Sequence, residues 1–286
     1  RPVSAVPRQL RRYLCLDDFE PAARRIMPKF LYGYVSGGAE HDAALRDNRK
    51  ALDEYGFVPR VLNDVSSRNQ TTTLFGKTYA APFGIPPMGS SALCAYRGDI
   101  VYARAASALN VPMILSAASL IRLEDVIKEN PNAWYQAYLA GLPERIEPLV
   151  DRVAAAGYDT FVVTADVPVP PNRENNIRNG FQTPIKITPK VAWDTITHPQ
   201  WMLGTFARTY LNHGMPHFEN MDANQGPPVL SKNLMRNIGA RDQLASITAF
   251  LGVAAAVVLG VAPAKDAFAP FADPLVFLFV GTFILA

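Results

Sequence analysis

The chain has 286 residues, of which 49% are hydrophobic and 19% are charged, and its formal net charge is +3. This composition supplies enough apolar side chains for a sizeable core and excludes a wholly disordered chain. The lysines and arginines are scattered, so nucleic-acid binding is not expected. The two cysteines, Cys15 and Cys94, lack CxxC spacing. They indicate small buried or part-buried thiols in a reducing compartment, and they argue against disulfides or a structural zinc site.

Residues 1–80 are predicted to be an N-terminal helical segment that leads into the main domain. Residues 17–53 have helical character, with Pro28 inside the stretch and a turn at Ser36-Gly37-Gly38.

Between residues 81 and 166, short apolar runs of strand length alternate with longer amphipathic stretches. This alternation is typical of βαβ units, and its pitch of roughly 25 to 30 residues fits a (β/α)8 barrel. The predicted strands are 82–88, 111–117, 133–139 and 160–166, and the predicted helices are 99–109, 123–129 and 143–156. No fifth strand is recognisable before the chain becomes apolar, so we expect a TIM (β/α)8 barrel truncated to about its first half.

Residues 167–244 are rich in Pro, Asn and His and only weakly periodic. They are predicted to be a long loop that associates with the membrane. A structureless connection of this length usually signals a lid, a binding loop or disorder. Trp193, and Trp201 beside Pro199, indicate short helical pieces resting on a partner surface.

The functional site of a parallel barrel lies at the carboxyl ends of its strands. Small or polar residues close each apolar run here: Pro87, Met88, Gly89, Ser116, Gln136, Tyr138, Thr164 and Asp166. Neutral hydrogen-bonding side chains suit the edge of a heteroaromatic ring, whereas a metal would call for carboxylate or imidazole. Arg173, in the following loop, either binds a substrate carboxylate or is a solvated arginine. The pattern favours a flat cofactor and an anionic substrate.

At these residues the sequence resembles the FMN-dependent L-2-hydroxy-acid dehydrogenases and oxidases, and among them the bacterial L-lactate dehydrogenases, over residues 14–244. The matching motifs are PKFLYGYVSGGAE (28–40), RNQTTTLFGKTYAAPFGIPPMG (68–89), ARAASALNVPMILSAAS (103–119), WYQAYL (134–139), VVTADVP (162–168) and THPQW (197–201).

The resemblance implies that FMN is the cofactor, that a small 2-hydroxy acid such as L-lactate is oxidised to a 2-oxo acid, and that the family forms homo-oligomers. It assigns substrate binding to Tyr34, Tyr138 and Arg173. It assigns flavin binding to Pro87, Met88, Gly89, Ser116, Gln136 and Thr164. Asp166 would orient the catalytic histidine.

Several motifs of that family are absent from this sequence. They are the SNHGGR-like motif that carries the catalytic histidine and a substrate arginine, the lysine that ends the fifth strand, and the phosphate site. The four histidines, His41, His198, His213 and His217, offer no substitute, and those beyond residue 166 are expected to be exposed. His213 and His217 stand four apart, but the glycine and proline between them argue against a helical metal site. The sequence therefore predicts a chain that is inactive alone.

Residues 245–286 form an apolar tail, in which residues 245–264 carry no charge. That run has the length of one transmembrane helix, the alternative being a buried helix of a soluble core. Lys232, Arg236 and Arg241 would keep the preceding domain cytoplasmic.

The last stretch, FADPLVFLFVGTFILA (271–286), resembles an early span of a divalent-anion:sodium symporter. The chain starts with Arg1 and stops inside an apolar run, which predicts a fragment with a junction near Gln243. The alternative function is therefore a membrane transport or anchoring fragment that carries a relic flavin-barrel half.

Overall fold

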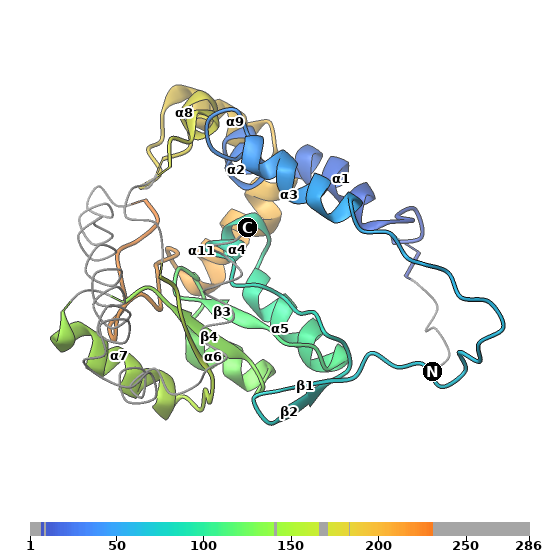
Figure 1. The fold of residues 1–286 in the computed structure, drawn as a ribbon. Helices are drawn as coiled ribbons and strands as arrows, with labels where there is room; N and C mark the ends of the chain where they lie inside the picture. The colour runs from blue at the N-terminus through green and yellow to red at the C-terminus, as the bar shows by residue number, and fades with distance from the viewer. Residues whose placement is uncertain (1–6, 9, 140–141, 166–170, 183, 231–286) are drawn as a thin grey trace, which may run out of the picture.

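The computed structural model describes residues 7–8, 10–139, 142–165, 171–182 and 184–230. Figure 1 shows a helical layer, with α2, α8 and α9 side by side, above an α/β part built around a small sheet. Asp166 and the predicted transmembrane tail, residues 245–286, lie outside the described residues. None of the helices in those ranges is both long and apolar enough to cross a membrane.

The sheet confirms the predicted parallel α/β pattern. Its strands are β3 (Ile114–Ser116), β4 (Trp134–Ala137) and β5 (Phe161–Val163), in the order β3-β4-β5, and both pairs are parallel. Each strand lies within a predicted range but is shorter. The first predicted strand, 82–88, is present only as a parallel bridge between Ile85 and Met113 on the far side of β3.

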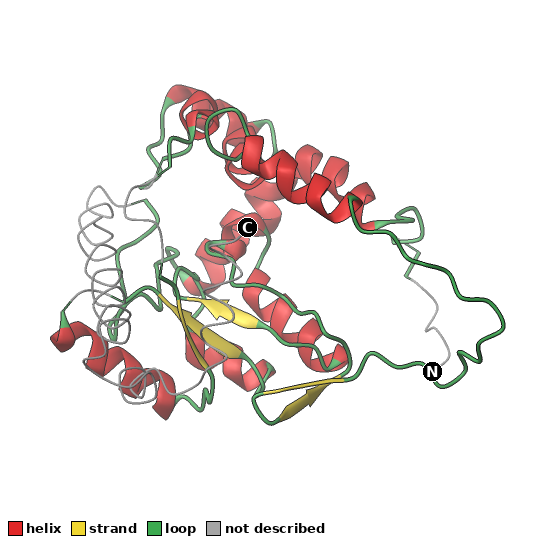
Figure 2. Ribbon diagram, in the orientation of Figure 1, coloured by secondary structure: helices red, strands yellow, loops and turns green. Residues whose placement is uncertain are grey.

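Helices follow the strands at the predicted places. They are α5 (Gly98–Leu109), α6 (Leu123–Glu129) and α7 (Pro143–Ala155), and Figure 2 shows them packed around the sheet. α7 begins with a proline, which suits the first helical position because that residue needs no hydrogen-bonded N–H. Its Leu149 and Val153, four residues apart, are its buried side chains.

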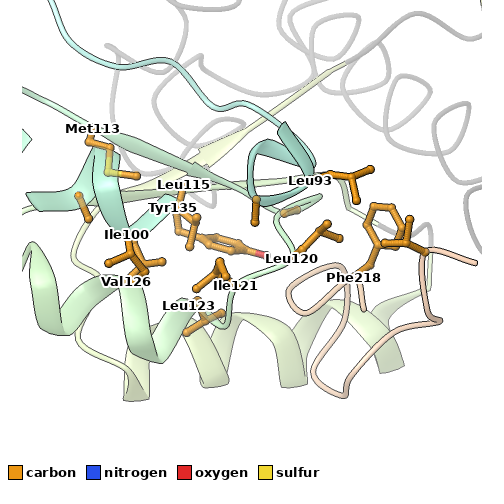
Figure 3. Packing of buried hydrophobic residues seen from close by; sticks show 14 of the residues in the cluster. Leu93, Ile100, Met113, Leu115, Leu120, Ile121, Leu123, Val126, Tyr135 and Phe218 are labelled. Carbon is orange, nitrogen blue, oxygen red and sulfur yellow. The ribbon is translucent and has the colours of Figure 1, made fainter. Parts of the chain in front are cut away.

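The core has two parts because side chains alternate between the two faces of a strand. Every residue of β3 and β4 is buried. Leu115 and Tyr135 face the larger cluster, which Figure 3 shows between the sheet and the helices. Ile114 and Trp134, the first residues of their strands, face a smaller cluster.

A hairpin covers the smaller cluster and was not predicted. Strands β1 (Thr72–Leu74) and β2 (Lys77–Tyr79) pair antiparallel around Phe75 and Gly76, which both have positive φ angles, as a tight two-residue hairpin turn requires. Phe75 packs edge-on against Trp134 with ring centroids 5.0 Å apart. The hairpin thus lies at the amino ends of the strands and leaves their carboxyl ends for a site.

The predicted N-terminal helical segment consists of η1 (Leu16–Asp18), α1 (Phe19–Ile26), α2 (Lys29–Ser36) and α3 (Ala43–Asp53), and α4 (Ser91–Cys94) follows later. α2 begins directly after Pro28, and the predicted turn separates α2 from α3.

Cys15 is exposed, contrary to the expectation of buried thiols. Cys94 is half-buried, and burial raises the pKa of its thiol to about 11.

The segment predicted as a long loop contains helices where it is described. They are α8 (Glu174–Asn179), α9 (Pro189–Ile196), α10 (Pro199–Trp201), the π-helical turn η2 (Met202–Ala207) and α11 (Arg208–His213). Trp201 is buried, and its Nε1 donates to the Leu93 carbonyl at 2.8 Å. It therefore rests on the chain's own core and not on a partner surface, whereas Trp193 is 70% exposed.

The loop of residues 216–229 is anchored in the core by Asn220, which is fully buried. Its Oδ1 accepts a hydrogen bond from the Leu123 amide at 2.9 Å, and its Nδ2 donates to the Ile121 carbonyl at 2.7 Å. The Tyr135 hydroxyl donates to the Asn220 carbonyl. One asparagine thus joins this loop to the start of α6 and to β4.

An ion pair between α6 and α7 makes stability depend on pH. Arg152 donates through Nε and Nη2 to the Glu124 carboxylate at 2.8 and 3.0 Å. These hydrogen bonds hold the pKa of Glu124 down to about 2, below its ordinary value of 4.5. Because the folded pKa is the lower one, the stabilisation is present above pH 4.5 and is lost as pH falls towards 2.

We therefore expect the free energy of unfolding to fall less steeply with acid in Glu124→Gln than in the unmodified chain. Urea titrations at steps from about pH 6 to about pH 3 measure both slopes. Equal slopes would show that this pair does not contribute to the acid sensitivity.

Candidate functional site

Three predicted site residues form one hydrogen-bonded row at the carboxyl edge of the sheet. Ser116 ends β3, Gln136 lies in β4 and Thr164 directly follows β5. The Ser116 hydroxyl donates to Gln136 Oε1 at 3.2 Å, and Gln136 Nε2 donates to Thr164 Oγ1 at 2.8 Å. The register places Ser116 opposite Gln136 and Gln136 opposite Val162, so parallel pairing brings the three side chains together.

The orientation of the Gln136 amide is fixed from both sides. The Ala117 amide also donates to its Oε1, at 3.3 Å, so the oxygen faces β3 and the nitrogen faces β5. Ser116 and Gln136 are almost fully buried, and Thr164 is half-buried. The row offers neutral donors and acceptors held in place, a donor set that fits the edge of a flavin ring and not a metal ion.

The predicted backbone contacts lie beside this row. The Ser90 amide donates to the Ala118 carbonyl at 3.0 Å, which holds the segment after Met88 against the end of β3. A Cβ on Gly89 would lie 3.0 Å from the Ala118 Cβ and 3.9 Å from Ser116 Oγ. Gly89 therefore packs closely against the end of β3, where the Cβ of any other residue would crowd Ala118.

Tyr34 and Arg173 form a second group, between α2 and the start of α8. The Tyr34 ring stacks on Phe181 with centroids 4.0 Å apart, and the Arg173 guanidinium carbon lies 5.0 Å from the Tyr34 ring centroid. Phe181 was not predicted, because nothing in the local pattern marks a stacking partner so distant in sequence.

Arg173 also binds the end of α2. Its Nη2 donates to the carbonyl of Tyr34 at 2.7 Å and to the carbonyl of Gly37. These carbonyls lie at the carboxyl end of the helix, where intrahelical partners are missing. The two forks of a guanidinium, Nε with Nη2 and Nη1 with Nη2, both include Nη2, so with these two bonds in place Arg173 would contact a substrate carboxylate at one point, through Nη1 or Nε.

The remaining predicted residues are distributed as follows. Tyr138 follows β4 directly and is half-buried. His198 and His217 are also partly buried, contrary to the expected exposure. Nδ1 of His198 lies 2.7 Å from the Asp194 carbonyl oxygen, and Nδ1 of His217 lies 2.7 Å from the Met215 carbonyl oxygen.

His213 is exposed, as expected, and its Nε2 lies 3.0 Å from the Tyr96 hydroxyl oxygen. The hydrogen bonds of these three histidines are therefore made to groups of residues 194–217 and to Tyr96 and Arg97, away from the Ser116–Gln136–Thr164 row.

Comparisons with known proteins identify relatives of this chain. (S)-Mandelate dehydrogenase of Pseudomonas putida is 32% identical over 211 residues, which cover 73% of this chain and 52% of that protein. A putative L-lactate dehydrogenase of Mycobacterium tuberculosis is 35% identical over 196 residues, covering 68% and 47%. L-lactate oxidase of Lysinibacillus sphaericus is 37% identical over 176 residues, covering 61% and 45%. The chain thus spans about half the length of these relatives.

A solved structure supports the barrel fold of the described α/β units. The crystal structure of the monotopic membrane protein (S)-mandelate dehydrogenase matches with a TM-score of 0.65 and 33% identity, covering 71% of this chain and 53% of that one. The family model for FMN-dependent dehydrogenases matches residues 23–268 and so continues past the change of composition near Gln243. The symporter-like stretch, 271–286, lies beyond that match and remains a prediction. The match over most of its length shows that the chain belongs to the FMN-dependent dehydrogenase family, whose cofactor is FMN.

Proposed function

We propose that this chain carries the flavin-binding part of a site for the FMN-dependent oxidation of a small L-2-hydroxy acid to a 2-oxo acid, with L-lactate as the leading substrate, and that it is inactive alone. The observation that carries the proposal is the row formed by Ser116, Gln136 and Thr164 across three neighbouring strand ends. When bound, FMN supplies the ring that accepts the electrons from the substrate. Related proteins named for lactate and for mandelate support the substrate class.

In this proposal the chain's residues bind the flavin and the substrate and hold both in orientation. The buried amide of Gln136 holds the edge of the flavin ring, and Gly89 allows the ring to approach the backbone. Arg173 would hold the substrate carboxylate, with the hydroxyl groups of Tyr34 and Tyr138 beside it. Asp166 would orient a catalytic histidine, and the sequence contains no SNHGGR-like motif to provide one.

Titration of the purified full chain with FMN, followed by assays with L-lactate and (S)-mandelate and an artificial electron acceptor, tests the proposal. We expect a flavin complex without steady oxidation of either acid, because the histidine motif is absent. Failure to bind FMN would contradict the proposed function. Steady turnover of L-lactate would instead contradict the predicted inactivity and retain the function.

Membrane association is part of the proposal and rests on an exposed surface around α8 and α9. Its large apolar side chains are more than half exposed, and basic side chains lie among them in sequence. This α8–α9 surface consists of Ile177, Arg178, Lys186, Ile187, Lys190, Trp193 and Ile196. Lys190 Nζ donates to the Arg178 carbonyl at 2.6 Å and joins the two helices. Such a combination suits the interface of an anionic membrane, and one solved relative is a monotopic membrane protein.

We expect Trp193→Ser to weaken binding to vesicles of phosphatidylcholine and phosphatidylglycerol by roughly 30-fold, because burying an aromatic side chain in the interface contributes on the order of 2 kcal/mol. Co-sedimentation with vesicles measures the change. Leu109→Ser is the matched control, since Leu109 is 66% exposed at the far end of α5 (Figure 1). Equal losses in both variants would show that the α8–α9 surface is not the docking site.

A further inference from the structure

Asp99 is a buried acidic residue without a cationic partner. It is the second residue of α5 and is only 2% exposed. Among the described residues no cation forms an ion pair with it, and Arg97, two positions earlier, lies 4.0 Å from the Asp125 carboxylate instead. A buried charge that has no counter-charge is costly, so a carboxyl group in such a place tends to keep its proton.

The polar and titratable groups around Asp99, within the described part of the chain, are neutral near pH 7. They are the hydroxyls of Ser91 and Ser119, the thiol of Cys94 and the phenols of Tyr102 and Tyr158. Burial raises the pKa of Asp99 above its ordinary value of 3.8, and hydrogen bonding from the two serines and from the Asp99 amide opposes that rise only in part.

Two buried atoms at this place lack a partner. Neither Oδ2 of Asp99 nor Oγ of Ser91 makes a hydrogen bond of normal geometry to another described residue. The two segments are nevertheless in contact, because a Cβ on Gly98 would lie 2.7 Å from the Ser91 carbonyl oxygen. A hydrogen bond between Asp99 and Ser91 would satisfy both atoms. Either group can donate, but only the protonated carboxyl group donates without leaving a buried charge.

The Asp99 side chain interacts with two segments beside the row at the strand ends. Ser91 begins α4 and directly follows residues 87–90, which contain the predicted backbone contacts of the flavin. Ser119 closes the turn after β3, where its amide donates to the Ser116 carbonyl at 3.0 Å. One buried carboxyl group thus joins the segment of residues 87–91 to the turn that starts at Ser116.

We infer that Asp99 is a positioning residue of the proposed flavin site, a protonated carboxylic acid that donates to Ser91 and holds residues 87–91 against the turn after β3. This role rests on the proposed function, since it requires FMN to bind beside these segments. Asp99 acts through the backbone of residues 87–91 and has no contact of its own with the flavin.

Two substitutions of Asp99 in the full chain separate the charge state from the side chain. Asp99→Asn keeps a neutral donor and acceptor of the same shape, so the FMN dissociation constant near neutral pH should stay within about twofold of that of the unmodified chain. Asp99→Ala removes the buried link and should weaken FMN binding about tenfold. Quenching of FMN fluorescence measures both constants. Asp151→Asn and Asp151→Ala, at an exposed aspartate of α7, are the matched controls and should leave the affinity unchanged.

Two further measurements report the proton without FMN. The infrared spectrum near neutral pH should contain the carbonyl band of a protonated carboxyl group, and this band should be missing from Asp99→Asn. Urea titrations should show Asp99→Asn gaining stability relative to the unmodified chain as pH rises above 3.8. The folded pKa of Asp99 is the higher one, so the unmodified chain loses stability as pH rises from the unfolded pKa to the folded pKa, whereas asparagine does not titrate.

Three results would overturn the inference. Equal FMN affinities in Asp99→Ala and the unmodified chain would show that Asp99 does not position the site. A loss in Asp99→Asn as large as in Asp99→Ala would show that the ionised form is required. Identical infrared spectra of Asp99→Asn and the unmodified chain would show that Asp99 carries no proton, and this readout does not depend on whether the alanine variant folds. Failure of the unmodified chain to bind FMN would contradict the proposed function as well, whereas any of the three results in a chain that binds FMN contradicts the inference alone.

Discussion

Replacing Gln136 with leucine is expected to weaken FMN binding by about tenfold or more. The variant keeps the size of the side chain but removes the buried amide that joins Ser116 to Thr164. A buried hydrogen bond that is lost costs on the order of 1–3 kcal/mol, and about 1.4 kcal/mol corresponds to a tenfold change in affinity. Quenching of FMN fluorescence during titration measures the dissociation constant.

Gln225→Leu is the matched control for this experiment. Gln225 is an exposed glutamine whose Nε2 donates to Glu219 Oε1 at 2.8 Å, outside the row at the strand ends. Its substitution should leave the FMN affinity unchanged. Equal affinities in the Gln136 and Gln225 variants, with unchanged circular dichroism, would show that Gln136 does not contact the flavin.

Asn220→Ala is expected to lower the free energy of unfolding by about 2–4 kcal/mol. The substitution leaves the buried Leu123 amide without its side-chain partner and removes one of two side-chain hydrogen bonds to the Ile121 carbonyl, the other coming from the Ser119 hydroxyl at 3.2 Å. Each unsatisfied buried polar group costs on the order of 1–3 kcal/mol. The loss should also loosen the start of α6, because the Asn220 side chain binds the amide of its first residue.

Urea unfolding near neutral pH measures this effect, with Asn224→Ala as the control. Asn224 lies in the same loop but is exposed, so its substitution should change stability by less than about 0.5 kcal/mol. Similar values for the two variants would show that the loop of residues 216–229 is not anchored through Asn220.

Regular elements near the site were predictable because local patterns encode them. Apolar runs of strand length alternate with amphipathic stretches, and β3, β4 and β5 with α5, α6 and α7 lie at those places. Polar residues that close consecutive strands must share one edge of a parallel sheet. The meeting of Ser116, Gln136 and Thr164 therefore followed from the order of the elements.

Contacts between distant segments were not predictable. The helices of residues 174–213 have weak periodicity because their buried side chains, such as Trp201, face α2 and α4 and not a continuous stripe. The stacking of Phe181 on Tyr34 and the bonds of Asn220 to the start of α6 likewise depend on chain positions that only the fold brings together.

The sequence by itself determined the family and the parallel α/β pattern, because both depend on short motifs and on side-chain periodicity, and it predicted the residues that would face the flavin. Only the tertiary structure decided how Arg173 binds the end of α2 and how Asn220 binds the start of α6, because these contacts join segments that lie far apart in the sequence.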